Sequence, residues 1–293
     1  MPQIAANGVT LEYEAYGDPA APPLLLIMGL GAQLTLWPIE LVEALVARGF
    51  HVIRYDNRDI GLSTKFTHAA VPDLPAMMMA LMSGKPPALP YTLADMADDA
   101  AALLTALGID KAHVVGASMG GMIAQLVAIH HPERVASLTS IMSTTGNPML
   151  PPARPEAMAA LMERPTTAEL TDVLALGLRI SSAIGSPGYP APEDRLRTRI
   201  ERDFNRSFHP TGAARQMAAI MADGDRRERL KTVTAPTLVI HGEDDPLVPV
   251  EGGKDTAAAI PGSTLLTIPG MGHDLPMELV DRIADAIAGV AKG

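Results

Sequence analysis

Three kinds of side chain that together perform nucleophilic catalysis occur at separate points of the sequence: Ser118, an acidic run from Glu243 to Asp245, and His273. A serine hydroxyl alone is a poor nucleophile, so an imidazole must take its proton and a carboxylate must orient and stabilise that ring. Each group follows an apolar run that is typical of a buried strand. Because parallel strands end on the same side of a sheet, we expect the three groups to lie together.

Ser118 lies in the frame Gly116-x-Ser118-x-Gly120, between the apolar runs 112–115 and 122–129. This pattern predicts a strand, a sharp turn and a helix, in which the glycines let strand and helix pass close together. Ser118 would then lie at a helix N-terminus, where free N–H groups, including that of Met119, can stabilise an oxyanion. Taken alone, the frame also fits a glycine-rich turn with an incidental serine.

The elements that must position these groups follow from the apolar pattern. Strands are predicted at 3–5, 9–16, 23–28, 51–55, 112–117, 135–142, 236–241 and 264–268, the first two joined as a hairpin by Asn7-Gly8. Helices are predicted at 37–48, 92–107, 155–163, 167–184, 192–208, 211–222 and 277–290. Strands are absent from the predictions between 143 and 232. We therefore expect an α/β core domain, 1–142 and 233–293, interrupted by a helical cap, 143–232.

Three features allow two interpretations each. The methionine-rich segment 67–91, which includes Met78 and Met82, is either a flap beside a hydrophobic substrate or a short helix packed on the core. Trp37, the sole tryptophan, either lines the substrate pocket or anchors the core. The five arginines between Arg195 and Arg206 alternate with acids, which favours a solvated face of ion pairs over an anion site.

Composition excludes several classes of function. The 293 residues carry a net charge of −10 with no long basic run, which argues against nucleic acid or an anionic membrane as the main partner. There is no cysteine, and the histidines form no metal-binding pattern, so neither a metal nor a thiol nucleophile is predicted. No signal-peptide pattern and no membrane-spanning run of about 20 apolar residues is found, so we expect a cytoplasmic protein.

Together the motifs resemble the α/β-hydrolase superfamily over nearly the whole chain. The matching stretches are Met28 to Gly31, Arg54 to Ser63, Gly116 to Gly121, His241 to Pro249 and Gly270 to His273. The order serine, acid, histidine is that of this superfamily. Two positions depart from it, since Met28 stands where many members have histidine and Asp59 where many have glycine.

The resemblance implies the α/β-hydrolase fold, with a mostly parallel central sheet flanked by helices and an inserted cap. It implies that Ser118 is the nucleophile, Asp245 the acid and His273 the base, with the N–H groups of Leu30 and Met119 as the oxyanion hole. Within the superfamily the chain is most similar to bacterial carboxylesterases, including methyl esterases that act on polyketides, and these use no cofactor.

We therefore expect hydrolysis of a small to medium hydrophobic ester through an acyl-enzyme intermediate, with a small molecule as the partner. A lactonase, a C–C bond hydrolase or a perhydrolase would keep the same three residues. A ligand-binding receptor with slow turnover is a further alternative from a different class. The sequence is compatible with a monomer or a homodimer.

Overall fold

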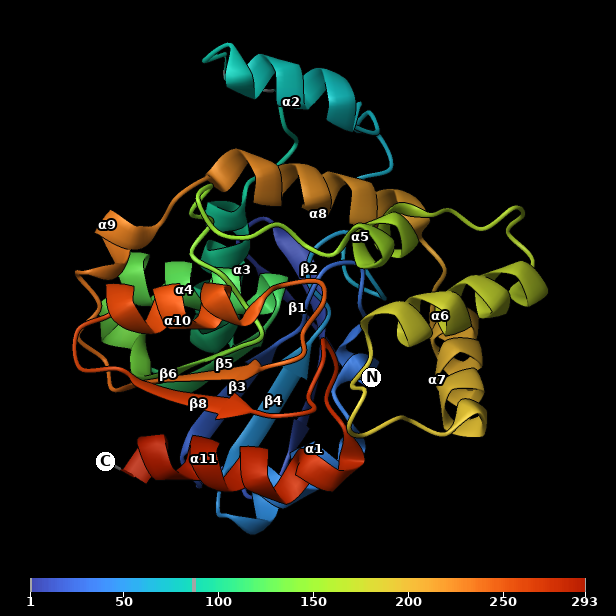
Figure 1. Ribbon diagram of the computed structural model, residues 1–293. Coiled ribbons are helices and arrows are strands. Elements are labelled where there is room, and N and C mark those ends of the chain that lie inside the picture. Colours follow the sequence, from blue (N-terminus) through green and yellow to red (C-terminus); the bar gives the residue numbers. More distant parts are fainter. Residues whose placement is uncertain (1, 86–87, 293) are drawn as a thin grey trace.

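The computed structural model describes residues 2–85 and 88–292, and these form one eight-stranded sheet with helices on both faces (Figure 1). The strands are β1 (Gln3–Ala6), β2 (Val9–Tyr16), β3 (Pro23–Ile27), β4 (His51–Tyr55), β5 (Ala112–Ala117), β6 (Val135–Ile141), β7 (Thr237–Gly242) and β8 (Thr264–Ile268). Their order across the sheet is β1-β2-β4-β3-β5-β6-β7-β8. The pairs β1–β2 and β2–β4 are antiparallel and the remaining pairs are parallel, which confirms the predicted fold class.

Helices cover both faces of this sheet. The longer ones are α1 (Ile39–Ala47), α2 (Leu74–Met82), α3 (Leu93–Ala106), α4 (Met119–His130), α5 (Pro155–Met162), α6 (Leu170–Ile184), α7 (Glu193–Arg206), α8 (Pro210–Asp223), α10 (Val250–Ala259) and α11 (Val280–Lys292), and α9 (Arg227–Leu230) is a single turn. Three short 3₁₀ turns are η1 (Leu34–Leu36), η2 (Pro132–Arg134) and η3 (Met277–Leu279). In Figure 1, α1 and α11 lie on one side of the sheet, and α3, α4 and α10 on the other.

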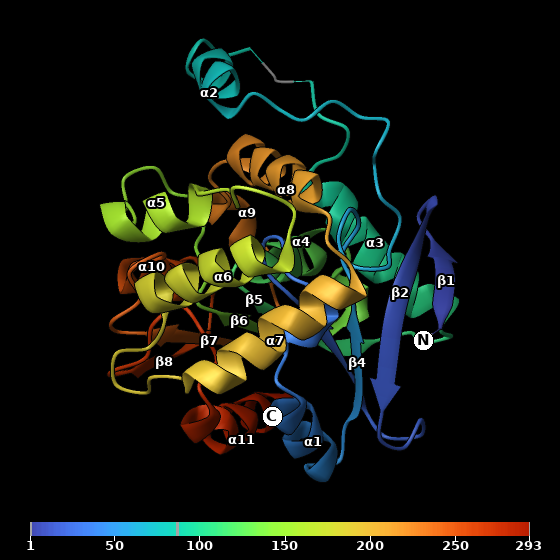
Figure 2. The ribbon, with the colours of Figure 1, turned by 90° about the vertical axis from the view of Figure 1, so that its right-hand side faces the viewer.

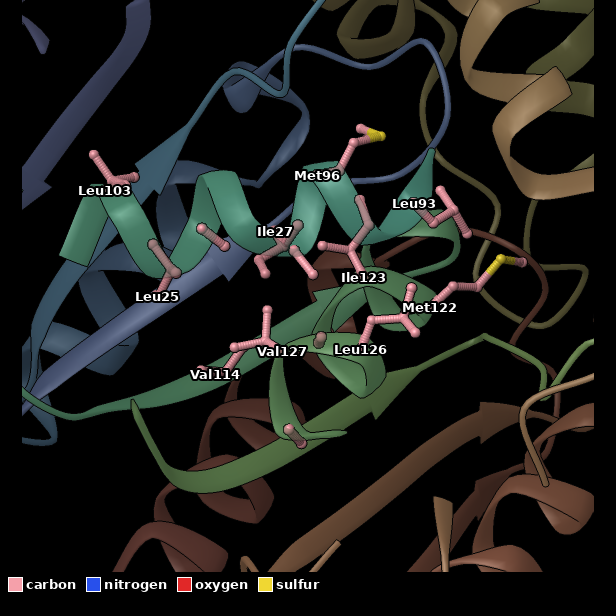
Figure 3. Close-up of a cluster of buried hydrophobic side chains, with 14 of the residues drawn as sticks. Leu25, Ile27, Leu93, Met96, Leu103, Val114, Met122, Ile123, Leu126 and Val127 are labelled. Atoms are coloured by element: carbon pink, nitrogen blue, oxygen red, sulfur yellow. The ribbon is translucent and has the colours of Figure 1, made fainter. Parts of the chain in front are cut away.

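The two faces of the sheet form two apolar cores. Along β3, Leu24 and Leu26 point to the core beneath α1 and α11, whereas Leu25 and Ile27 point to the core beneath α3 and α4. Figure 3 shows the second core, in which strand residues such as Val114 meet side chains of both helices. A strand that is apolar on both faces must be covered on both, which accounts for the continuous apolar run 23–28.

Helices α5 to α9 stand between β6 and β7 in the chain, where only helices are predicted. Helices α6 and α7 lie side by side at the edge of the molecule that faces the viewer in Figure 2. Helix α8 packs closer to the sheet, because its buried Ala219 belongs to the core of α3 and α4. The division into a core and a cap at residues 142 and 232 stays a prediction.

The helix expected at 37–48 is α1, which begins at Ile39 because Pro38 sits at its N-cap, and one further helix was missed. Helix α10 was not predicted, since Gly252-Gly253 lowers the helix propensity. A Cβ at Gly253 would lie 2.5 Å from the imidazole of His241, so the glycine allows α10 to pack onto β7.

Candidate active site

Ser118 lies at the turn between β5 and α4, with φ 56° and ψ −121°, which are unusual values for a residue with a side chain. The close approach of strand and helix explains the neighbouring glycines. A Cβ at Gly116 would lie 2.0 Å from the carbonyl oxygen of Gly120, and a Cβ at Gly120 would lie 2.0 Å from that of Ile27. The sequence thus holds the Ser118 hydroxyl at the carboxyl end of the sheet in a strained conformation.

His273 and Asp245 complete a hydrogen-bonded series with Ser118. The Nε2 atom of His273 is 3.0 Å from Ser118 Oγ, and its Nδ1 atom is 2.7 Å from Asp245 Oδ2. The other carboxylate oxygen of Asp245 accepts hydrogen bonds from the N–H groups of Leu247 and Val248. A carboxylate on Nδ1–H leaves Nε2 free to accept a proton from the serine. The arrangement can therefore activate the hydroxyl as a nucleophile.

Two backbone N–H groups flank Ser118. Within the described part of the chain, neither Leu30 nor Met119 donates its N–H to a protein acceptor. Met119 is the first residue of α4, and a Cβ at Gly29 would lie 3.1 Å from that of Ser118, so the loop after β3 passes directly over the serine. Unpaired donors beside a nucleophile are suited to bind an oxyanion.

His241 is a buried neighbour of the site that sequence reasoning missed. Its Nε2 lies 3.7 Å from Asp245 Oδ2 and donates to the carbonyl of Val248 at 2.8 Å. Burial lowers the pKa of His241, so its ring is held neutral. The hydrogen bond of this neutral ring to Val248 therefore holds the loop that carries Asp245, and the ring places no positive charge beside the Asp245 carboxylate. In the sequence, the one sign of this role was that His241 begins the stretch His241 to Pro249, which resembles the family.

Asp59, which had no interpretation from the sequence, is buried and has φ 72°. The positive φ explains why glycine is frequent at this position in the family. The carboxylate pairs with Arg215 of α8 and accepts hydrogen bonds from Tyr91 and from the N–H of Phe66. Burial raises the pKa of Asp59, but the hydrogen bonds from Arg215, Phe66 and Tyr91 lower it by more. The pKa of Asp59 therefore lies below its usual value. Asp59 thus ties α8 to the loop after β4.

A cavity of about 1300 Å³ opens above Ser118 and His273. Its inner wall is apolar and includes Met28, Leu30, Met122, Met142, Met217 and Leu247. The departure at Met28 therefore adds apolar surface close to the serine. The volume exceeds that of a typical small-molecule pocket, so the cavity has room for a large ligand.

The three expected pocket residues do not line this cavity. Trp37 is fully buried in the core beneath α1 and α11, because η1 turns the chain away from the loop after β3. Met78 and Met82 are 47% and 83% exposed on α2, which packs on α8 at the top of Figure 1. In the segment 67–91, for which a flap or a core helix was expected, residues 74–82 form the outlying helix α2, and residues 86 and 87 lie outside the described part of the chain. Proximity in sequence and methionine content did not predict these positions.

In the part of the chain that the structure describes, no group of three or more metal-ligating side chains forms a metal site. No helix among these residues is long and apolar enough to cross a bilayer.

Comparisons with known proteins place this geometry in context. The family described as having the alpha/beta hydrolase fold matches residues 22–278. Rhodomycin D methylesterase DauP of Streptomyces sp. (strain C5) is 32% identical over 309 residues, covering 97% of this chain and 95% of the relative. The enol-lactonase from Burkholderia xenovorans LB400 is similar in structure, with a TM-score of 0.75 at 25% identity, covering 100% of both chains. A thermophilic esterase from Thermogutta terrifontis has a TM-score of 0.74 at 25% identity, covering 100% of this chain and 98% of that one.

Proposed function

Because this chain belongs to the α/β-hydrolase fold family, we propose that it hydrolyses carboxylic esters with Ser118, His273 and Asp245 as the catalytic triad. The observation that carries the proposal is the hydrogen-bonded series from Ser118 Oγ through His273 to Asp245, at 3.0 and 2.7 Å. The likeness to rhodomycin D methylesterase over 97% of this chain supports an ester, and a methyl ester in particular, as the substrate.

The proposed reaction has two halves. His273 Nε2 takes the proton of Ser118, whose Oγ attacks the ester carbonyl carbon, and the negative oxygen is bound by the N–H groups of Leu30 and Met119. His273 then gives its proton to the departing alcohol, which leaves an acyl group on Ser118. Next, His273 takes a proton from water, the hydroxide attacks the acyl carbon, and the proton returns to Ser118 Oγ. The carboxylate of Asp245 stabilises the imidazolium in both halves.

A lactone is a cyclic ester, so the same triad would open its ring. The structural likeness to an enol-lactonase favours this as the second candidate activity. Comparing kcat/KM for a lactone and for the open-chain ester of the same acid separates the two. Release of a hydroxy acid at the faster rate would identify a lactonase.

The test of the triad uses a fluorophosphonate probe followed by mass spectrometry, together with a series of p-nitrophenyl esters. We expect labelling at Ser118 and turnover of the esters, and loss of both in Ser118→Ala. Unchanged turnover in that variant would refute the proposed nucleophile. Binding of small ligands without labelling or turnover would instead indicate the slow receptor.

A further inference from the structure

Helix α7 carries five arginines, and four of them pair with carboxylates. The pairs are Arg195–Glu40, Arg197–Glu193, Arg202–Asp203 and Arg206–Asp56. The expected solvated face of ion pairs is therefore correct for Arg195, Arg197 and Arg202, whereas the pair of Arg206 is buried. Among the described residues, Arg199 has no carboxylate within 4.0 Å of its guanidinium group.

Arg199 lines the cavity above Ser118 and is partly buried there. Its Nη2 donates to the hydroxyl of Ser181 at 3.0 Å, and no other side-chain hydrogen bond joins it to the described part of the chain. A guanidinium has five N–H donors, so four have no hydrogen-bond partner among the described residues. Burial lowers the pKa of Arg199, and the nearby carboxylates of Asp203 and Asp274 offset only part of this effect.

The contacts of α6 place Arg199 on the same wall of the cavity as His273. Ser181, which holds the guanidinium, lies one helical turn before Ile184, or roughly 5 Å along the axis. The carbonyl of Ile184 accepts the hydrogen bond of the His273 backbone N–H at 2.7 Å. Figure 2 shows α6 and α7 side by side at this edge of the molecule. A ligand in the cavity can thus contact both the triad and Arg199.

Two carboxylates act on the charge of Arg199, namely Asp203, one helical turn further along α7, and Asp274 in the wall of the cavity. The carboxylate of Asp274 is hydrogen-bonded to the hydroxyl of Ser186, and burial raises its pKa. In the described part of the structure, neither Asp203 nor Asp274 forms an ion pair or a hydrogen bond with Arg199, whose one side-chain bond goes to Ser181. The two carboxylates therefore offset part of the charge of Arg199 without occupying its donors.

We propose that the guanidinium of Arg199 binds a carboxylate of the substrate, so that the preferred substrates are esters that carry a second, ionised carboxyl group. The inference rests on the proposed function, because it takes the ester to react at Ser118. A planar guanidinium with four unused donors can bind a carboxylate through two parallel hydrogen bonds. The apolar wall near Met122 and Met142 would contact the hydrocarbon between the two ends of the substrate.

The experiment compares monomethyl and dimethyl esters of straight-chain dicarboxylic acids, which differ only in the free carboxylate. Wild type should show a higher kcat/KM for the monomethyl ester at the chain length that spans the cavity. Arg199→Met should lower kcat/KM for monomethyl esters by about 10- to 100-fold, as for a lost charge-assisted pair, and leave dimethyl esters within about 3-fold. Arg199→Lys should recover part of the loss, since it keeps the charge but not the fork.

Arg197→Met is the matched control, because Arg197 is on the same helix, is exposed and does not line the cavity. It should leave both substrates unchanged. Equal losses on the two substrates in Arg199→Met would show that Arg199 positions the α6 wall instead of binding substrate, and no loss on either would show that it has no role. Both results overturn the proposal.

A binding measurement separates this proposal from the proposed function. Calorimetric titration with the free dicarboxylates should give a Kd for wild type that is at least about 10-fold lower than for Arg199→Met. Equal Kd values would overturn the role of Arg199 even in an active esterase. Conversely, selective binding by wild type with no ester turnover would retain the carboxylate site and refute the esterase.

Discussion

Replacing Asp59 with glycine leaves Arg215 buried without its carboxylate. The side chains of Asp59 and Arg215 are 0% and 1% exposed, so solvent does little to screen the pair. Removing one partner of such a pair costs about 3 to 5 kcal/mol. Glycine removes the strain of the φ of 72°, which stabilises the folded state by roughly 1 kcal/mol. It also makes the unfolded chain more flexible, which destabilises the folded state by about the same amount. We therefore expect Asp59→Gly to lower the free energy of unfolding by about 3 to 5 kcal/mol.

The double variant tests whether the pair itself is the cause. Arg215→Leu alone should cost a similar amount, because it leaves the Asp59 carboxylate buried and unpaired. Removing both partners is often close to neutral, so Asp59→Gly/Arg215→Leu should cost less than either single change. The coupling free energy from urea unfolding at pH 7 should exceed about 3 kcal/mol. Additive single effects would refute this account.

The exposed pair Arg179–Glu163 is the control, with side chains 53% and 43% exposed. Arg179→Leu should change the free energy of unfolding by less than about 1 kcal/mol. Since the folded pKa of Asp59 lies below the unfolded value of about 3.9, its contribution is present above that pH and is lost as the pH falls through the folded pKa. The stability advantage of wild type over the double variant should therefore shrink below about pH 4. An advantage that grows in acid would contradict the depressed pKa.

Two further changes examine the site itself. Asp245→Asn should lower kcat by about 10³- to 10⁴-fold in ester assays. The new amide oxygen would accept hydrogen bonds from the N–H groups of Leu247 and Val248, so the amide NH2 would face His273 Nδ1. The ring proton would then lie on Nε2, which could no longer accept the proton of Ser118. Asp244→Asn should have a much smaller effect, and the reverse ranking would reassign the acid. Gly120→Ala should lower kcat by about 100-fold or more, because its Cβ would lie 2.0 Å from the carbonyl oxygen of Ile27 and displace the turn. Gly289→Ala, at an exposed helical position with open space around it, should instead retain activity and raise the unfolding free energy by up to about 1 kcal/mol.

Much of the core could be predicted because its signals are local. The alternation of apolar runs and helical patterns gave the strands of the sheet, and the capping box of Thr92 and Asp95 marked the start of α3 within one residue. The expectation that Ser118, Asp245 and His273 lie together needed only the rule that parallel strands end on one side. Their hydrogen-bonded geometry agrees with that expectation, and their catalytic roles stay predictions.

The features that escaped prediction depend on contacts between distant segments. For Trp37 the sequence allowed either the pocket or a core anchor, and only the packing of the chain after η1 shows that it is a core anchor beneath α1 and α11. Helix α10 contains Gly252-Gly253, which lowers its helix propensity. The structure shows why a glycine is present, since a Cβ at Gly253 would clash with His241 where α10 packs on β7. Asp59 could be understood only once its backbone conformation and its partner on α8 were known.

The arginines of α7 carried a signal that composition alone hid. Arg195, Arg199, Arg202 and Arg206 recur at helical spacing and so lie along one face, whereas Arg197 does not share it. Arg206 fixes that face to the loop after β4 through its buried pair with Asp56. Arg199, two turns earlier, is thereby held at the cavity by the same rigid helix, so binding a carboxylate there would cost little additional ordering. On this face of α7, Arg195, Arg202 and Arg206 each pair with a carboxylate of the protein. Arg199 does not, which favours a carboxylate of the ligand as its partner.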